Sequence, residues 1–252
     1  MTVPTAAFID SGGMLRASAH GAHALFTARA GGVSAAPYDS LNLGPWTADD
    51  PASVVENQRR VAELASTDEQ PRRLLLGRQV HESSVAAHLV GCADAEVDGV
   101  DAHVTDRDDI AIAVLTADCV PVALLAPWGV GVAHAGWRGL AGGVLGGAVG
   151  ELLAIGGPEV GPASITAFIG PSAGACCYEV GDEVHAAFTG WPGHDPDARN
   201  LDMPALAEAA LRHEGVGDVI GAGRCTICDD RYFSHRASGG TTGRQAGVAW
   251  RA

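Results

Sequence analysis

Three side chains suited to binding a metal ion stand at the ends of apolar segments of this sequence. His81 ends the segment LLLGRQVH, Cys119 lies in the turn TADCVP between two apolar runs, and His134 ends the run GVGVAHAG. Imidazole and thiolate are preferred ligands of zinc, and three protein ligands leave the fourth tetrahedral position open, as catalytic zinc sites require. The three residues therefore predict a catalytic zinc centre built at strand ends.

Spacing alone leaves a second interpretation of these residues open. The separation of His81, Cys119 and His134 matches no short zinc signature. Both histidines could instead be core residues that bond to backbone carbonyls, and Cys119 could be a small buried hydrophobic residue.

The other cysteines of the chain have no evident partners in the sequence. Six cysteines at irregular positions are too few for a disulfide framework, so thiols or metal ligands are expected. Cys225 and Cys228 form CTIC, which resembles a redox pair or half of a zinc knuckle. No second CxxC or HxxxH completes a knuckle, and the adjacent Cys176 and Cys177 are expected to be poorly placed for it. We therefore expect these four cysteines to be structural or incidental.

Composition limits the class of protein. With 252 residues, of which 47% are hydrophobic, the chain can bury one substantial core, and we expect a single domain over residues 1–252. Residues 1–20 are expected to be a poorly constrained segment or an edge strand. A net charge of −14 argues against nucleic-acid binding, which needs clustered Lys and Arg. Neither a signal peptide nor a membrane span is evident, which predicts a cytoplasmic protein.

The elements that must position the metal ligands follow from the apolar patterns. Asp49 or Asp50 can cap a helix that has Pro51 in its first turn and ends near Ser66. Residues 110–136 contain three apolar, β-branched runs separated by turns, which predicts three strands. Further helices are expected over 140–155, 182–188 and 203–214, and further strands over 164–169 and 245–250. Strands grouped between helices favour an α+β fold.

Several longer motifs carry a family resemblance. The strings GRQVH, DAHVT, TADCVPV, AHAGWRG, IGPSAGACCYEVGDEV and TGRQAG occur in this order, and FTARAGGVS and SLNLG precede them. In these motifs the sequence resembles the YfiH-like family, described both as laccase-domain polyphenol oxidases and as purine nucleoside phosphorylases. The resemblance covers nearly the whole chain, from about His23 to Trp250.

The resemblance implies a fold, a metal site and an activity. It implies one domain of helices around central mixed sheets, similar to cysteine hydrolases, and zinc held by His81, Cys119 and His134. It further implies phosphorolysis of adenosine, inosine and methylthioadenosine, adenosine deamination, and an older copper-dependent laccase activity. The expected partners are thus a purine nucleoside and phosphate, and the active unit is expected to be a monomer or homodimer.

Three positions depart from the family pattern. Glu82 follows His81 where glycine is common, and His103 stands where an apolar residue is usual. Near the end, YFSHRA replaces a segment that resembles FFSYRR, so that Ala237 follows Arg236. A second cation at that position is therefore absent from the motif.

Phosphorolysis needs an anion site, and arginine suits it because its guanidinium binds phosphate bidentately and keeps its charge. Among the motif arginines Arg29 is preferred, since Gly31 and Gly32 would let backbone amides approach a phosphate. Each arginine could instead form a structural ion pair, and Arg138 could stack on Trp137. The predicted substrate-binding residues are Arg29, Asn42, Arg138, Arg236 and Arg244.

The predicted catalytic residues are Cys119, Arg29 and Asp118. Asp118 or Asp101 is expected to orient a metal ligand or exchange protons, since a carboxylate commonly fixes a ligating histidine. Asp118 could equally be a turn-capping residue.

Two alternative functions belong to different classes. A copper-dependent phenol oxidase would need several copper centres, but the ten histidines contain no HxH pair. A thiol hydrolase would use Cys119 as nucleophile and a histidine as its base. A purine-binding module without catalysis is the remaining possibility.

Overall fold

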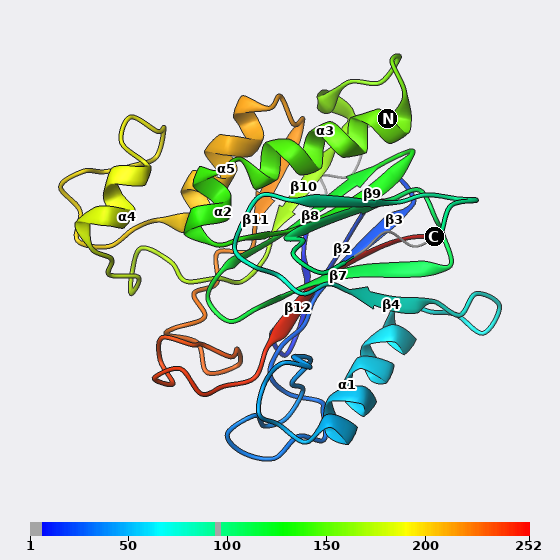
Figure 1. Cartoon of the computed structure of the whole chain (residues 1–252), viewed down its shortest axis with the longest axis horizontal. Helices are drawn as coiled ribbons and strands as arrows, with labels where there is room; N and C mark the ends of the chain where they lie inside the picture. The colour runs from blue at the N-terminus through cyan, green and yellow to red at the C-terminus, as the bar shows by residue number, and fades with distance from the viewer. Residues whose placement is uncertain (1–6, 94–96) are drawn as a thin grey trace.

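The protein is described by a computed structural model covering residues 7–93 and 97–252, and two six-stranded mixed sheets dominate it (Figure 1). In the first sheet the strand order is β1-β2-β3-β12-β7-β4, and β4 and β7 are parallel while the other neighbours are antiparallel. Its strands are β1 (Ile9–Ser11), β2 (Met14–Ala19), β3 (Ala22–Phe26), β4 (Arg73–Leu76), β7 (Ile110–Thr116) and β12 (Gln245–Arg251).

The second sheet has the order β11-β10-β8-β9-β6-β5. Its two outer pairs, β10 with β11 and β5 with β6, are parallel, and its inner neighbours are antiparallel. Its strands are β5 (Val85–His88), β6 (Ala102–Thr105), β8 (Val120–Ala126), β9 (Gly129–Ala135), β10 (Thr166–Ile169) and β11 (Asp218–Gly221).

Helices cover the outer faces of both sheets, which gives four layers (Figure 1). Helix α1 (Pro51–Leu64) packs Val61 on the first sheet. The second sheet is covered by α2 (Trp137–Ala141), α3 (Val144–Gly156) and α5 (Met203–His213). A short 3-10 turn (Pro162–Ser164) precedes β10, and α4 (Asp182–Ala187) lies between β10 and α5. The mixed α+β fold with central sheets flanked by helices is confirmed.

Strands β7, β8 and β9 have core on both sides. Every residue of β7, β8 and β9 is buried, because the sheets face each other across one core and helices close the outside. Strands buried on both faces have continuous apolar runs instead of alternating ones. This explains why residues 110–136 could be recognised in the sequence.

The predicted elements agree with the structure except at one helix. Asp50 caps α1 by accepting hydrogen bonds from the backbone N–H groups of Ala52 and Ser53, as expected. The single helix expected over 140–155 is instead two helices, α2 and α3, which Gly142 and Gly143 separate. Gly143 has φ +87°, a left-handed conformation that glycine adopts without strain, and this conformation interrupts the helix. No helix in the two described ranges is long and apolar enough to cross a membrane.

His103, one of the departures from the family pattern, is fully buried on β6. Its Nδ1 lies 3.2 Å from Nε2 of His88. Burial and the neighbouring His88 lower the pKa of His103 to about 3. The folded protein therefore keeps His103 neutral over a pH range in which the unfolded chain binds a proton.

We expect His103 to make the protein less stable in mild acid. Its folded pKa lies below the usual value of 6.5, so its stabilising contribution is complete above pH 6.5 and declines as the pH falls toward 3. The decline is at most about 1.4 kcal/mol per pH unit. His103→Val should flatten the pH dependence of the free energy of unfolding, measured by urea denaturation between pH 7.5 and 5. Replacement of the exposed His213, as His213→Gln, is the control and should leave that dependence unchanged. An unchanged slope in His103→Val would contradict the assignment.

Candidate metal centre and substrate pocket

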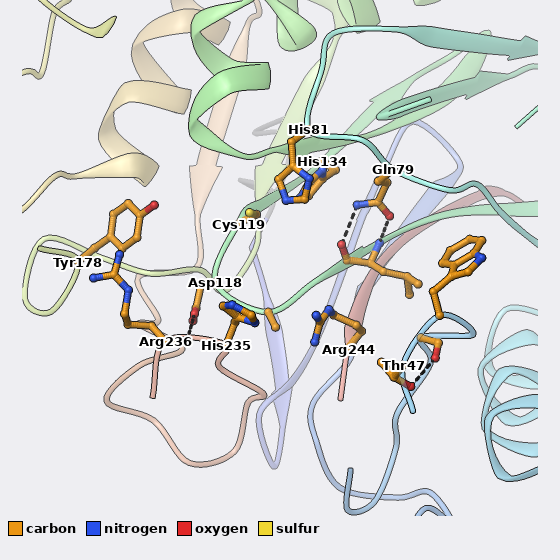
Figure 2. Close-up of a pocket in the computed structure, with 14 residues that line it drawn as sticks. Thr47, Gln79, His81, Asp118, Cys119, His134, Tyr178, His235, Arg236 and Arg244 are labelled. Atoms are coloured by element: carbon orange, nitrogen blue, oxygen red, sulfur yellow. Dashed lines mark hydrogen bonds between the residues drawn. The ribbon is translucent and has the colours of Figure 1, made fainter. Parts of the chain in front are cut away.

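The three predicted metal ligands meet where the two sheets adjoin. His81 follows β4, Cys119 lies in the turn from β7 to β8, and His134 is in β9. One ligand atom from each residue lies within 4.8 Å of the other two, so the group could hold a metal ion. The two imidazole rings meet edge to face with centroids 4.7 Å apart (Figure 2). The alternative of separate core histidines and an isolated buried thiol does not describe this arrangement.

One buried carboxylate positions two of these ligands. Asp101 accepts a hydrogen bond of 2.7 Å from Nδ1 of His134, which leaves the other ring nitrogen free to bind a metal. The same carboxylate accepts backbone N–H bonds from Val80, His81 and Glu82 at 2.9 to 3.1 Å. His81 has φ +65°, an uncommon conformation for a residue with a side chain, and these bonds hold it there.

The electrostatics of the centre favour a thiolate. Burial opposes ionisation of Cys119, but His134 and His81 outweigh it and lower the pKa of the thiol to about 6. Burial likewise opposes protonation of His134, yet Cys119 and Asp101 raise its pKa to about 9. Burial would raise the pKa of Asp101, but His134 and the backbone donors lower it. The thiolate is the form of cysteine that binds metals, so the donor set suits a thiophilic divalent ion.

Gly136, at the start of α2, leaves room for the ligands. A Cβ atom at this position would lie 3.0 Å from Cδ2 of His81 and 3.3 Å from Sγ of Cys119. Side chains cannot approach that closely without displacement.

Gly136→Ala should therefore weaken metal binding about tenfold or more, since overpacking of this kind costs about 1–3 kcal/mol. Competition with a chromogenic chelator measures the affinity. Gly150→Ala is the matched control, because nothing lies within 4 Å of a Cβ on this exposed glycine of α3. It should leave metal affinity unchanged and stabilise the helix by up to about 1 kcal/mol. Equal metal affinities in the two variants would contradict the crowding argument.

A pocket of about 410 Å³ opens beside the metal ligands, a volume typical of small-molecule sites (Figure 2). Its walls combine aromatic, cationic and amide side chains. The lining residues are Gly44, Trp46, Thr47, Gln79, His81, Leu115, Ala117, Asp118, Cys119, His134, Tyr178, His235, Arg236 and Arg244.

Arg244 is the best placed cation in this pocket. One of its terminal nitrogens, Nη1, donates to the backbone carbonyls of Thr242 and Gly243, and no carboxylate within the described part of the chain pairs with its guanidinium. Burial lowers the pKa of Arg244, but a guanidinium remains charged at neutral pH. The group thus faces the cavity as a charged guanidinium that has no carboxylate of the described ranges paired with it.

Arg236 and Tyr178 form the opposite wall. The guanidinium of Arg236 lies 5.1 Å from the centre of the Tyr178 ring and donates to the backbone carbonyl of Glu179. Burial raises the pKa of Tyr178, so its phenol keeps a proton that it can donate.

Three of the five predicted substrate residues are not part of the pocket lining, and the two arginines among them have other partners. Arg29 pairs with Asp39 at 2.8 Å and lies over the Phe233 ring, beside a different surface hollow. Arg138 stacks on Trp137 at 4.1 Å and pairs with Glu183 at 3.6 Å.

Asn42 is fully buried, and its side chain holds the backbone of two residues that line the pocket, Gly44 and Arg244. Its Oδ1 accepts hydrogen bonds from the backbone N–H groups of Gly44 and Arg244, at 3.0 and 2.8 Å. Its Nδ2 donates to Thr47 and Asp49. Asn42 is therefore a positioning residue that joins the turn bearing Trp46 to Arg244.

Asp118 holds two loops together beside Cys119. Its carboxylate accepts a 2.7 Å bond from the Thr226 hydroxyl and a 2.8 Å bond from the backbone N–H of Arg236. Its φ of +96° turns the chain sharply before the cysteine. The carboxylate that contacts a candidate ligand histidine is that of Asp101, whereas Asp118 anchors the pocket wall.

Sequence reasoning missed several residues that line the pocket. Trp46 and Thr47 follow the SLNLG motif, Gln79 is part of GRQVH, and His235 lies where the family segment departs. The sequence signal that could have identified Gln79 is its place in the family motif GRQVH. In the structure its side chain hydrogen-bonds both the backbone N–H and the backbone carbonyl of Leu115.

Fold and site together define a class: layered α+β proteins that set an open His2Cys centre beside a basic pocket. A family model described as multi-copper polyphenol oxidoreductase laccase matches residues 23–252. The chain belongs to this family, the YfiH-like or laccase-domain family.

Relatives and solved structures agree with the assignment. The chain is 42% identical to a purine nucleoside phosphorylase of Streptomyces griseus, over 91% of this chain and 94% of the relative. It is 36% identical to the purine nucleoside phosphorylase YfiH of Escherichia coli, over 91% and 94% of the two chains. Among structures, YfiH of Bacillus licheniformis has a TM-score of 0.85 at 31% identity, covering 97% of this chain and 99% of that one. YlmD of Geobacillus stearothermophilus has a TM-score of 0.84 at 34% identity, covering 97% and 98%.

Proposed function

We propose that this protein is a zinc-dependent purine nucleoside phosphorylase that acts on adenosine, inosine and methylthioadenosine, with adenosine deamination as a side activity. The observation that carries the proposal is the position of Arg244, which has no paired carboxylate among the described residues, in the same pocket as the open His81–Cys119–His134 centre. The names of the relatives support the same substrate class.

The chemistry assigns a task to each part of the pocket. Phosphate attacks the anomeric carbon while the bond from sugar to base breaks; the leaving purine takes up a proton, and the sugar is released as its 1-phosphate, which is ribose 1-phosphate for adenosine and inosine. Arg244 binds the phosphate and Arg236 adds charge at the wall. Trp46 and Tyr178 offer aromatic surface for the purine. Zinc, when bound, supplies Lewis acidity at the open coordination position.

The remaining candidates keep supporting roles in this proposal. Asn42 fixes the backbone of Arg244, and Asp118 fixes that of Arg236. Arg29 pairs with Asp39 beside a different hollow, and Arg138 lies at the surface outside the pocket. Among the described residues, only one group that contains histidine could hold a metal, which disfavours a multi-copper oxidase.

Product analysis tests the proposal. Purified protein is incubated with adenosine, with and without phosphate, and products are separated by chromatography. We expect equimolar adenine and ribose 1-phosphate only when phosphate is present, and inosine as the minor product of deamination. Release of adenine without phosphate would indicate a hydrolase, and an absence of base release at micromolar enzyme would refute the proposal.

A thiol hydrolase is the second candidate, because Cys119, His134 and Asp101 are arranged in the order of a catalytic triad. Iodoacetamide labelling mapped to the Cys119 peptide separates the two functions. Protection that disappears on chelation supports the zinc enzyme, whereas rapid labelling of the metal-loaded protein supports the hydrolase.

A further inference from the structure

Four cysteines outside the active centre come together in the folded protein. Cys176, Cys177, Cys225 and Cys228 have sulfur atoms that all lie within 4.8 Å of one another. The expectation that the adjacent pair is poorly placed to complete a knuckle with CTIC is wrong. The topology explains the meeting.

Strands β10 and β11 are parallel neighbours, with Ile169 opposite Gly221. The chain therefore leaves both strands at the same edge of the sheet, and each cysteine pair follows within a few residues. Ser172 and Cys225 extend the parallel pairing as an isolated bridge. The sequence hides this proximity because the two segments are far apart along the chain.

We propose that these four thiolates form a second metal site, a tetrahedral site for one Zn²⁺ that is structural in role. In a tetrahedron with Zn–S bonds of about 2.3 Å, the sulfur atoms are about 3.8 Å apart. Sγ of Cys228 lies 3.4 Å from both Cys176 and Cys177, and the whole set stays within 4.8 Å. An iron–sulfur cluster would need room for several atoms between the sulfurs.

The surroundings also suit thiolates. The backbone N–H of Gly174 donates to Sγ of Cys225 at 3.4 Å, as donors near a metal-bound thiolate do. All four cysteines are free thiols. Cys176 and Cys177 lie equally close to Cys228, so a disulfide from Cys228 to one of them would leave the other without this partner. Four thiolates close the coordination of zinc, which is typical of structural sites.

The site lies behind the wall of the substrate pocket. Tyr178 directly follows Cys177, and Thr226 lies inside the CTIC turn, where its hydroxyl bonds Asp118. Asp118 in turn holds the backbone of Arg236. A metal bound by both loops would thus fix Tyr178 and Arg236 relative to each other, in addition to their direct contact.

Metal counting on the full chain tests the inference. After expression with zinc and removal of loosely bound ions, elemental analysis should give two zinc ions per wild-type chain. Cys119→Ala should keep one, Cys228→Ser should keep one, and the double variant should bind none. Cys92→Ser is the matched control, since Cys92 is an exposed thiol outside both groups, and it should keep two.

Cobalt spectroscopy and mass measurement cover the case in which Cys228→Ser does not fold. Cys119→Ala retains all four clustered cysteines, so Co²⁺ should give it the absorption of a tetrahedral four-thiolate site, and a chelator should lower its Tm. A Cys119→Ala chain without metal would overturn the inference, as would an intact mass showing a disulfide among these cysteines. Bound iron in place of zinc would overturn the assignment of the ion. None of these measurements depends on phosphorolysis, so they test this site separately from the proposed function.

Discussion

Cys119→Ala is expected to empty the His81–Cys119–His134 centre and to lower kcat/KM for phosphorolysis by at least about a thousandfold. Metal Lewis acidity contributes several kcal/mol to transition-state stabilisation, and about 4 kcal/mol corresponds to that factor. The fold should survive, because the alanine side chain that replaces the Cys119 thiolate is small and uncharged. Elemental analysis, circular dichroism and steady-state kinetics with adenosine and inosine provide the measurements.

Cys92→Ala is the control for the loss of a thiol as such. This exposed cysteine lies outside both metal-binding groups, so its replacement should leave kcat/KM and metal content as in the wild type. Full phosphorolysis in a Cys119→Ala protein would show that the centre is not required for the reaction. His81→Ala should repeat the loss, since it removes another ligand from the same group.

Asp101→Asn is expected to have the second largest effect, on both metal affinity and stability. The Asp101 carboxylate is fully buried and accepts four hydrogen bonds, from His134 and three successive backbone N–H groups. The asparagine amide replaces one of the two acceptor oxygens with an NH2 group, which cannot accept hydrogen bonds from these donors. Each buried donor left unsatisfied costs about 1–3 kcal/mol. Replacing such an outer partner of a ligating histidine typically weakens metal binding about 10–100-fold.

Chelator competition and urea denaturation measure the two effects. Asp202→Asn is the matched control, because Asp202 caps α5 by accepting one N–H bond from Ala205, and asparagine caps a helix equally well. It should change neither quantity. If Asp101→Asn bound metal as tightly as Asp202→Asn, the positioning role of Asp101 would be wrong.

The sequence predicted the parts of the molecule that depend on local pattern. Strands β7, β8 and β9 could be recognised because burial on both faces requires continuous apolar residues. The three candidate ligands could be proposed because imidazole and thiol stood at the ends of such strands within family motifs, and the structure brings them together. The departure at Glu82 also has a simple reason: the residue serves the centre through its backbone N–H, which any side chain allows. That the chain forms a single domain stays a prediction, and residues 1–6 of the N-terminal segment 1–20 lie outside the described residues.

What the sequence could not predict depends on pairing between distant segments. No local pattern shows that β10 and β11 are parallel neighbours, so the meeting of Cys176 and Cys177 with CTIC remained hidden. The same holds for the arginines. Motif context made Arg29 the preferred phosphate ligand, but Asp39 neutralises it, while Arg244 lies in the pocket without a carboxylate. Which charge is left unpaired is a property of the folded chain.

The three ligands come from both sheets, with His81 after a strand of the first, His134 in a strand of the second, and Cys119 at the crossing between them. An ion at this position would add a link between two layers that are joined mainly by apolar packing. Slow amide hydrogen exchange in the ligand-bearing ends of β7 and β9 would then report on occupancy, since opening either layer requires loss of a ligand. The metal centre would thereby make the two layers unfold as one cooperative unit.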